Sequence, residues 1–544
     1  MKNMENAAEN SNSPQKSLKK NAALNMTKTV MSLVFPLITF PYTSRVLGPA
    51  FLGKVHFAQS VVSYFSLAAS LGISAYAVRE SARLRNDRNA LSVFIKEIFS
   101  INMISTVAAY ILFAAALFAV PVLENYRPLL CVCASSILFA TLGMDYLYTG
   151  LEEFKYITIR SVAFQFLSLV LLFVFVRSQD DYLKYAAVSV VSSAGSNILN
   201  FFHARHFVDF RAKAQNLKKH LKPVFTLFAM SAAVSIYTVL DTTMLGFLKG
   251  DEAVGFYTAA TKINRLVIMM ITAATAVLLP RLSFYADKDR SEFLRLSNKA
   301  LQFVVMFSVP CAAGLFILAE PVIVLFSGGD FFPSVPVMKI MNAVIVMISI
   351  SGLLGSQIFI SVGKERLTLV SVIAGAAVNF TLNMILIPLH GAKGAAVGTL
   401  LAECTVTAVQ LAAGREYFKG GKNLIHALKV CISAFAMSAC VFAVCKFFNS
   451  YVLKILFGFF FGIFSYGLCL WLLKDRLFAE LLRQATGKIC GRDWSTAGGV
   501  PERGEALLQS AEEWSESGSA QSPTRNEMEG SAQIKITDGG KLKG

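Results

Sequence analysis

The sequence predicts an all-α protein that crosses a membrane about fourteen times, and three observations lead to this fold class. Hydrophobic residues make up 55% of the 544-residue chain and charged residues only 16%, whereas about a quarter of the residues in soluble domains are charged. Apolar runs long enough to span a bilayer recur along the chain. Lysine and arginine are abundant in every second connecting segment and scarce in the segments between.

The apolar runs give the expected positions of the spans. We expect them at about residues 24–44, 52–75, 93–120, 128–150, 156–176, 183–203, 223–248, 253–280, 297–319, 335–361, 366–388, 391–414, 424–447 and 451–473. The connecting segments on one side hold 24 Lys and Arg residues, and those on the other side hold 8. Because basic loops remain in the cytoplasm, we expect both termini to be cytoplasmic. The same bias accounts for the net charge of +17, so we infer no nucleic-acid partner.

The chain order predicts two six-helix bundles followed by two further spans. Apolar and polar segments set the expected boundaries. These are a polar N-terminus (1–20), a first bundle (21–203), a basic linker (204–222), a second bundle (223–414), two additional spans (415–473), an interfacial helix (474–494) and a disordered cytoplasmic tail (495–544). The helix at 474–494 alternates apolar and basic residues in the manner of a helix that lies on the membrane surface.

The first span contains two prolines, Pro36 and Pro41, and ends near Arg45. A proline removes one helical hydrogen bond, and membrane proteins tolerate the loss where protein or a water-filled cavity surrounds the helix. We therefore expect a first span that is interrupted at these prolines, faces a lumen and bends between transport states. Such interrupted spans are typical of transporters.

Short sequence echoes indicate that the second bundle repeats the first. Gly48 and then Gly53 recur as Gly246 and then Gly255, each time between the first and second span of a bundle. A second echo pairs 150–152 with 363–365. Six spans separate the copies, so the sequence predicts a parallel repeat about an axis along the membrane normal. In this register Asp241 occupies the position that Thr43 has in the first copy.

The span arrangement and two motifs carry a family resemblance. The motifs are F-P-Y-T-S-R-V-L-G-P-A-F-L-G at 40–53 and G-L-E-E-F-K-Y at 150–156. The chain resembles the Wzx-type polysaccharide flippases of the multidrug/oligosaccharidyl-lipid/polysaccharide exporter superfamily over residues 20–475. The resemblance implies a transporter of the bacterial inner membrane that flips undecaprenyl-diphosphate-linked oligosaccharide by alternating access. It also implies coupling to an H⁺ or Na⁺ gradient, and polysaccharide polymerases or glycosyltransferases as partners.

Three ionisable residues at membrane depth open the second bundle. Asp241 lies in the seventh span, and Lys262 and Arg265 lie in the eighth, three residues apart and therefore on one helical face. One interpretation is an internal ion pair. The other is an anion site in which the surplus positive charge holds the substrate's diphosphate, a group that arginine binds bidentately.

Four further charges lie nearer the ends of the spans. Asp145 and Arg160 have equal and opposite charge, which favours a structural pair. Arg45 and Lys54 stand at the outer ends of the first two spans. They either extend to the interface or form a cationic rim that meets the anionic head group.

Glu403, near the middle of the twelfth span, is the most costly carboxyl group in the sequence. We expect it to be hydrogen-bonded, with Asn379 and Asn383 as candidate partners. Together with Asp241 and Asp145 it is also a candidate for ion coupling.

The remaining patterns exclude other classes of function. The outer loops are too short to fold into a catalytic domain, and the sequence contains no nucleophile motif, phosphate-binding Gly-Lys loop or metal-ligand spacing. We therefore predict no enzyme, no cofactor and no metal site. The alternatives are a cation-coupled multidrug exporter of the same fold, which would need an acidic cavity, and a lipid II flippase.

Overall fold

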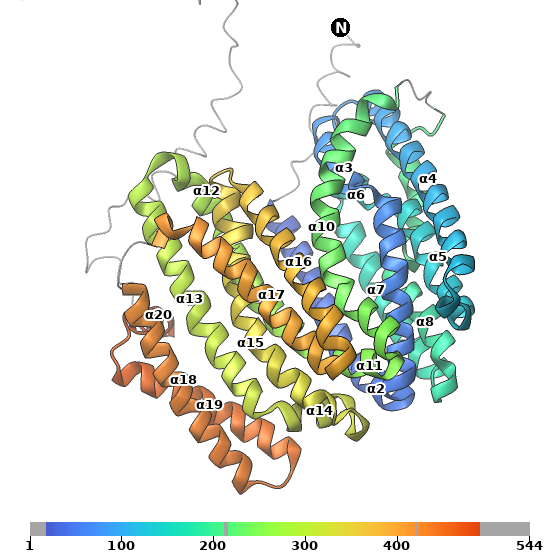
Figure 1. Cartoon of the computed structure of the whole chain (residues 1–544). Helices are drawn as coiled ribbons and strands as arrows, with labels where there is room; N and C mark the ends of the chain where they lie inside the picture. Colours follow the sequence, from blue (N-terminus) through green and yellow to red (C-terminus); the bar gives the residue numbers. More distant parts are fainter. Residues whose placement is uncertain (1–17, 212–215, 419–421, 490–544) are drawn as a thin grey trace, which may run out of the picture. The chain divides into compact units, whose positions relative to one another are not determined.

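The computed structural model describes residues 18–211, 216–418 and 422–489, and these ranges contain helices and turns but no strand (Figure 1). This confirms the predicted all-α class. The helices are α2 (Leu18–Ser70), α3 (Ile73–Arg83), α4 (Arg88–Ala119), α5 (Arg127–Gly143), α6 (Asp145–Gly150), α7 (Phe154–Phe175), α8 (Tyr182–Val190), α9 (Asn197–His203), α10 (Lys218–Lys249), α11 (Asp251–Ala276), α12 (Leu279–Lys288), α13 (Arg290–Ile317), α14 (Ala319–Ser327), α15 (Ser334–Leu353), α16 (Glu365–His390), α17 (Ala392–Ala413), α18 (Lys422–Phe447), α19 (Tyr451–Leu472) and α20 (Arg476–Ile489). Short 3₁₀ turns are η1 (Pro121–Tyr126), η2 (Gln179–Asp181), η4 (Ala204–His206), η5 (Gly329–Phe331) and η7 (Arg415–Phe418), and π-helical turns are η3 (Val191–Gly195) and η6 (Leu354–Phe359).

In the described part of the chain, eleven helices are long and apolar enough to cross a membrane, or up to twelve when the bent pair α11 and α12 is one span. The chain is therefore a multi-pass membrane protein. Two features account for the difference from fourteen. Helix α2 carries the first two expected spans in one continuous element, and the sixth expected span is divided by the π-turn η3 into the short helices α8 and α9. The exact number of fourteen stays a prediction.

Helix α2 reverses direction at Gly48, the residue inside it whose dihedral angles are not helical (φ 69°, ψ 176°). Helical dihedral angles continue through Pro36 and Pro41. The helix is therefore not broken at these prolines, contrary to the expected interruption. A proline removes one hydrogen bond and can bend a helix whose dihedral angles stay helical. A kink at Pro36 and Pro41, and its role in gating, stay predictions.

The internal repeat is present, but its register differs from the expected one. Gly250 separates α10 from α11 with φ 83° and ψ −175°, close to the values of Gly48, whereas Gly246 lies inside α10. Gly53 and Gly255 each follow five residues after these turn glycines. In the corrected register Asp241, nine residues before Gly250, corresponds to Thr39 and not to Thr43.

The two repeated hairpins cross at very short range. A methyl group on Gly53 would lie 1.8 Å from the Asp251 carbonyl oxygen, and one on Gly255 would lie 2.0 Å from the Pro49 carbonyl oxygen. Pro49 and Asp251 are the residues directly after the two turn glycines, so the contact is reciprocal. Small residues allow two membrane helices to approach this closely. The pairing joins α2 to α11 as one of the main helix contacts of the molecule.

A second pair of turns, one in each half of the repeat, has matching backbone conformations and hydrogen bonds. Glu152 (φ 57°) and Gly363 (φ 67°) have left-handed backbones. In each case the next amide donates to the carbonyl five residues earlier, from Glu153 to Tyr148 and from Lys364 to Phe359. The predicted echo between 150–152 and 363–365 therefore marks the correct turns, with a register that differs by two residues.

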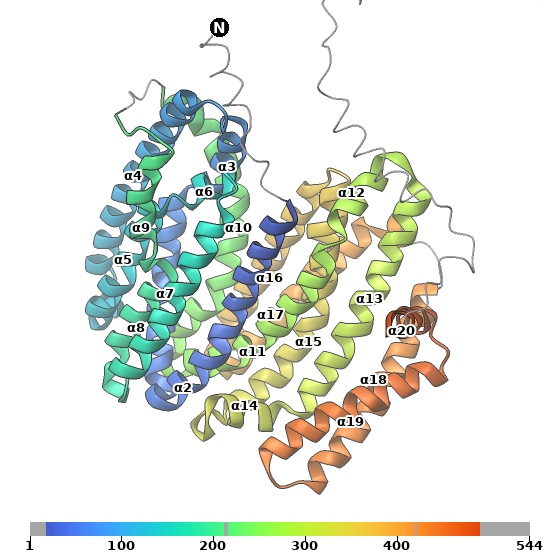
Figure 2. The same cartoon turned by 180° about the vertical axis from the view of Figure 1, so that it is seen from behind.

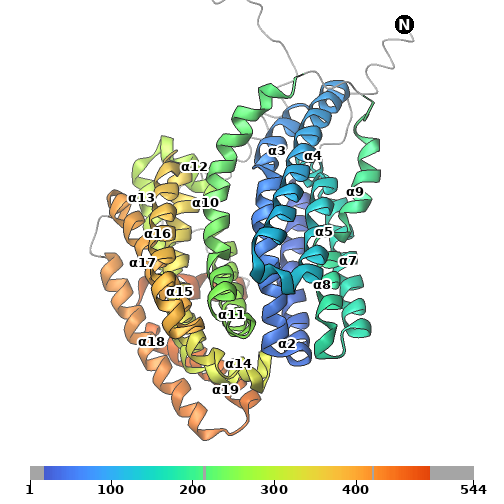
Figure 3. The same ribbon diagram turned by 45° about the vertical axis from the view of Figure 1, so that its right-hand side comes forward.

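Helix α10 links the two halves of the repeat. It contacts α2 and α3 of the first half as well as α11, α16 and α17 of the second, and Figure 3 shows it between the two groups of helices. The last spans, α18 and α19, pack against each other and against α13 and α14 (Figure 2). Both lie before Ala479, the residue at which a second unit of the chain begins.

The interfacial helix expected at 474–494 corresponds to α20, which begins at Arg476 and is described to Ile489. Residues 490–494 and the expected tail at 495–544 lie outside the described residues. Whether α20 lies on a membrane surface stays a prediction.

Candidate functional site

A polar cavity of about 730 Å³ lies among α2, α5, α7, α8, η3, α10 and α11. Nine of its lining residues are serines, and others are Thr39, Tyr64 and Tyr185. No aspartate or glutamate is among the lining residues. A cavity of this size is in the range that holds a small organic ligand or part of a larger one, and its wall is suited to hydrogen bonding rather than to binding a cation.

The second limb of α2 supplies one face of this wall. His56, Gln59, Ser63, Ser66 and Ser70 all line the cavity and follow one another at spacings of three and four residues. This spacing places polar side chains on one face of an otherwise apolar helix. The pattern is visible in the sequence, but the serines are individually unremarkable, and we did not predict His56 or the serine wall.

Two side chains with basic nitrogen atoms, Lys262 and His56, line the cavity. Lys262 lines it from α11, with its Nζ atom 5.9 Å from the centre of the Phe40 ring. His56 lines it from α2, and its Nε2 atom is buried with no hydrogen-bond partner in the described structure. Arg265 is exposed and donates to the carbonyl of Thr238, a lining residue, at 3.3 Å. The predicted pair Lys262 and Arg265 therefore lies at or beside the cavity.

Asp241 does not form the ion pair that was one interpretation of the sequence. Its Oδ1 atom accepts hydrogen bonds from Asn379 (3.0 Å) and Asn383 (2.6 Å), and its Oδ2 atom accepts from Tyr257 (2.5 Å) and Thr399 (2.6 Å). Among the described residues no cation lies within ion-pair distance of this carboxylate. No local sequence pattern predicts that amide and hydroxyl groups of α16 and α17 contact Asp241, since only the fold brings these helices together.

Glu403 accepts a hydrogen bond from Tyr237 at 2.7 Å. The predicted partners Asn379 and Asn383 bind Asp241 instead, so this expectation is wrong. The carboxyl group of Glu403 is buried, with 7% of the residue exposed. Glu403 thus joins α17 to α10 through Tyr237, which lies four residues, about one helical turn, before Asp241.

Arg45 and Lys54 are not among the residues that line the cavity. The Arg45 guanidinium donates to the carbonyls of Pro41 and Leu325, the second near the end of α14. The Lys54 ammonium lies 5.4 Å and 5.0 Å from the ring centres of Tyr126 and Tyr182. Both cations have protein partners, and their predicted role as a substrate rim stays untested.

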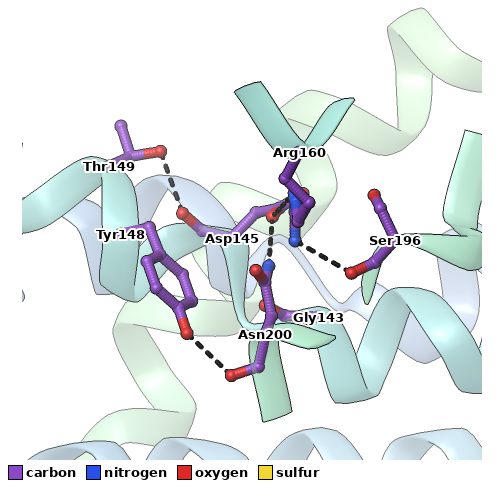
Figure 4. Close-up of polar contacts among 7 residues, drawn as sticks. All are labelled: Gly143, Asp145, Tyr148, Thr149, Arg160, Ser196 and Asn200. Carbon is purple, nitrogen blue, oxygen red and sulfur yellow. Dashed lines mark hydrogen bonds and ion pairs between the residues drawn. The ribbon is translucent and has the colours of Figure 1, made fainter. Parts of the chain in front are cut away.

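The predicted pair of Asp145 and Arg160 is confirmed, with 3.2 Å between Arg160 Nη2 and Asp145 Oδ1 (Figure 4). Asn200 donates to the same carboxylate oxygen at 2.9 Å and to the Gly143 carbonyl at 2.6 Å. Arg160 is 6% exposed. The cluster therefore ties α7 and α9 to the break between α5 and α6, which favours a structural role.

Glu97 is a buried carboxyl group that inspection of the sequence overlooked. It is completely buried, and it lies 2.9 Å from Lys219 Nζ and 2.8 Å from His220 Nε2. The backbone amide of Asn216 donates to it at 2.7 Å. Because Glu97 belongs to α4 and the other groups lie at or just before the start of α10, these contacts fix the first turn of α10 to the first bundle.

The chain is similar in sequence to proteins of polysaccharide export. Residues 18–285 match the model of the polysaccharide biosynthesis protein family. A putative O-antigen transporter of Escherichia coli (strain K12) is 23% identical over 404 residues, which cover 74% of this chain and 97% of that protein. A putative O-antigen transporter of Shigella dysenteriae is 26% identical over 408 residues, covering 73% of this chain and 100% of that protein.

Solved structures show the same fold. The lipid II flippase MurJ in an inward closed conformation superimposes with a TM-score of 0.68 and 16% identity, covering 84% of this chain and 100% of that chain. An inward-facing multidrug resistance MATE family transporter gives a TM-score of 0.56 and 16% identity, covering 71% of this chain and 94% of that chain. At these identities the likeness concerns the fold alone.

Proposed function

We propose that this chain, which is similar to the polysaccharide biosynthesis protein family and to putative O-antigen transporters, is a Wzx-type flippase of the multidrug/oligosaccharidyl-lipid/polysaccharide exporter superfamily that flips an undecaprenyl-diphosphate-linked oligosaccharide across the bacterial inner membrane by alternating access. The head group and glycan would pass through the polar cavity while the lipid tail remains in the bilayer. Both termini would lie in the cytoplasm. The relatives named above are transporters, and no catalytic role is proposed.

The observation that carries this proposal is the charge of the cavity. Lys262 enters it, Arg265 lies beside it, and no carboxylate lines it. Transfer of a diphosphate through hydrocarbon would carry a large desolvation penalty, and fixed cations along a polar path lower that penalty. A multidrug exporter for cationic drugs would need carboxylates in this position, so the cavity favours an anionic substrate.

We assign ion coupling to Asp241 in preference to Glu403. Asp241 belongs to α10, and the oxygen-bearing groups around it come from α11, α16 and α17. Carboxylate, amide and hydroxyl oxygens are the ligands of hard cations, and a proton would also neutralise the carboxylate. Loss of the negative charge or arrival of a cation would change all four contacts at once. Glu403, with its single described partner Tyr237, offers fewer oxygens.

The test of the substrate site uses a matched lysine. Lys339 on α15 lies 5.6 Å from the Phe316 ring, a contact like that of Lys262 with Phe40, but Lys339 does not line the cavity. In cells that lack the chromosomal copy, we expect lipid-linked oligosaccharide to accumulate in the inner leaflet. Expression of Lys339→Gln should relieve the accumulation, and expression of Lys262→Gln with Arg265→Gln should not.

Two outcomes would contradict the proposal. Normal surface glycan with altered drug resistance in the deletion strain would exclude the flippase function. Full flipping by a stably expressed double variant would place the anion site elsewhere. For coupling, flipping by Asp241→Asn in proteoliposomes should no longer respond to a Na⁺ or proton gradient, and a retained response would move the assignment to Glu403.

A further inference from the structure

The cavity is chemically different at its two ends. On the second limb of α2, the lining residue nearest to Gly48 is His56, and the residues from Gln59 to Ser70 that line the cavity are uncharged. Lys262 lies twelve residues after Gly250, at a depth equivalent to Ser60 in the first half. From that level to Ser70 the cavity wall extends about 15 Å along the helix at ~1.5 Å per residue. Arg265 lies beside the cavity three residues further along, at the level of Ser63. Beyond it, over about 10 Å at ~1.5 Å per residue to Ser70, the described lining residues include no cation and no carboxylate.

Five of the nine lining serines donate their hydroxyl protons to backbone carbonyls of the same helix or turn. The hydroxyl of Ser63 lies 2.6 Å from the Ser60 carbonyl, and that of Ser70 lies 3.0 Å from the Leu67 carbonyl. Ser136, Ser168 and Ser193 make the same kind of bond, at 2.7, 2.7 and 2.9 Å. A hydroxyl that donates to a carbonyl retains its lone pairs as acceptors, so these serines present acceptors to the cavity.

A cavity wall that is rich in hydrogen-bond acceptors and has no charged side chain binds neutral sugars better than charged ones. Sugar hydroxyls and acetamido N–H groups are donors and can bond to it. A carboxylate has only acceptor sites, and at the inner end of the cavity it would give up hydration without gaining a cation from the described lining residues, which is unfavourable. A cationic sugar would likewise find no carboxylate.

The corrected register of the internal repeat also indicates an uncharged cavity wall in the first half. Counted from the matching turns, Asp241 and Asn379 of the second half correspond to Thr39 and Ser168 of the first. Both counterparts line the cavity. The first half therefore has neutral hydroxyls where the second half has a carboxylate and an amide in a charged cluster.

We propose that the inner, serine-lined part of the cavity is a subsite for uncharged, hydroxyl-rich sugars, and that it selects neutral glycans against acidic ones. The subsite rests on the proposed function, since it places the diphosphate at the level of His56 and Lys262 and the glycan toward Ser70. The selectivity arises because the inner end of the site offers an anionic sugar no counter-charge, rather than because it binds one sugar tightly.

The test compares three probes on the purified full-length protein in nanodiscs. The first is undecaprenyl diphosphate without sugar. The second carries a neutral disaccharide of N-acetylglucosamine and glucose, and the third carries the same disaccharide with glucuronic acid in place of glucose. We expect the neutral probe to bind at least about tenfold more tightly than the acidic probe. Equal affinities, or tighter binding of the acidic probe, would overturn the inference.

A variant pair assigns the effect to the subsite. Ser70→Arg adds a cation at the inner end of the cavity and should reduce or reverse the preference for the neutral probe. Asn86→Arg adds the same charge at an exposed turn outside the cavity and should preserve the preference. A preference that is unchanged in Ser70→Arg would contradict the location. If Ser70→Arg does not fold, the comparison of probes on the unmodified protein still decides the selectivity.

The sugar-free probe separates the two hypotheses. Binding that Lys262→Gln abolishes, together with equal affinity for neutral and acidic glycans, would retain the proposed function and reject the subsite. Absence of binding by undecaprenyl diphosphate and by both glycolipids would reject the proposed function, and the subsite with it.

Discussion

The crossing of Gly53 and Gly255 gives the sharpest prediction about the fold. A methyl group on Gly53 would lie 1.8 Å from the Asp251 carbonyl oxygen and 2.6 Å from the Gly255 amide nitrogen. Ordinary contacts of such a carbon begin at 3.4 Å. Both obstructing atoms belong to the backbone, so neither can rotate away. Gly53→Ala must therefore separate α2 from α11 by roughly 1.5 Å, a shift comparable to one whole rise per helical residue.

The expected loss in the free energy of unfolding follows from the side-chain packing that this shift disturbs. Leu52, Val55 and Val254 flank the crossing and are completely buried, and overpacking of such a site typically costs about 1–3 kcal/mol. We expect about 2–3 kcal/mol for Gly53→Ala and a similar value for Gly255→Ala. The double variant should cost less than the two single costs together, because one separation accommodates both methyl groups.

Gly352 supplies the matched control. It is also a glycine within a helix, but a methyl group there meets nothing within 4 Å. Replacement by alanine should leave stability unchanged or raise it by up to about 1 kcal/mol through helix propensity. The measurement is the apparent thermal midpoint of the purified protein in nanodiscs. A Gly53→Ala variant as stable as Gly352→Ala would refute the close crossing, and strictly additive single effects would refute the shared separation.

Three further predictions concern polar contacts away from the cavity. Glu97→Ala should lower the free energy of unfolding by about 3–5 kcal/mol, since it leaves the buried His220 without its carboxylate partner. A thermal midpoint equal to that of the unmodified protein would exclude a structural ion pair. Arg160→Met should reduce stability more than Arg160→Lys, which retains the charge, and equal thermal midpoints for the two variants would argue against the paired role. The hydrogen bond and charge of Lys364 lower the pKa of Glu416 from its ordinary value of 4.5, so this contact stabilises the fold above pH 4.5 and is lost as the pH falls below it. Glu416→Gln should remove that part of the acid-dependent fall in thermal midpoint, and an identical pH profile would contradict the assignment.

The sequence predicted the helical class and the matching turns because both depend on local composition. Apolar runs set the spans, and glycines mark places where the chain reverses. The register of the repeat was wrong because Gly246 and Gly250 are both near the turn. Only the backbone angles show that Gly250 forms the turn. Gly246 lies inside the helix and packs against the Phe57 ring.

Side-chain partners were predictable only where charge alone determined them. Asp145 and Arg160 lie close in sequence with opposite charge, and they pair. Asp241 appeared to need a cation, yet it is satisfied by uncharged groups from helices about 140 residues away in the sequence. His56 was overlooked because the cavity that it lines is formed together with five other helices. No local sequence pattern predicts that these helices meet there.

The two halves of the repeat are joined by a helix that is fixed at both ends. The first turn of α10 is held to α4 by Glu97, and its later part is held to α16 and α17 by Asp241. The reciprocal crossing at Gly53 and Gly255 lies beyond the second of these attachments, next to the turn after α10. If the halves rotate about that crossing during alternating access, α10 must bend between its two attachments, because neither end can move freely. We infer that any ion or proton that alters the contacts of Asp241 changes the strain on this helix. Under the proposed function, α10 would link the substrate cavity, which it lines through Ser235 and Thr238, to the contacts of Asp241 that a coupling ion or proton would change.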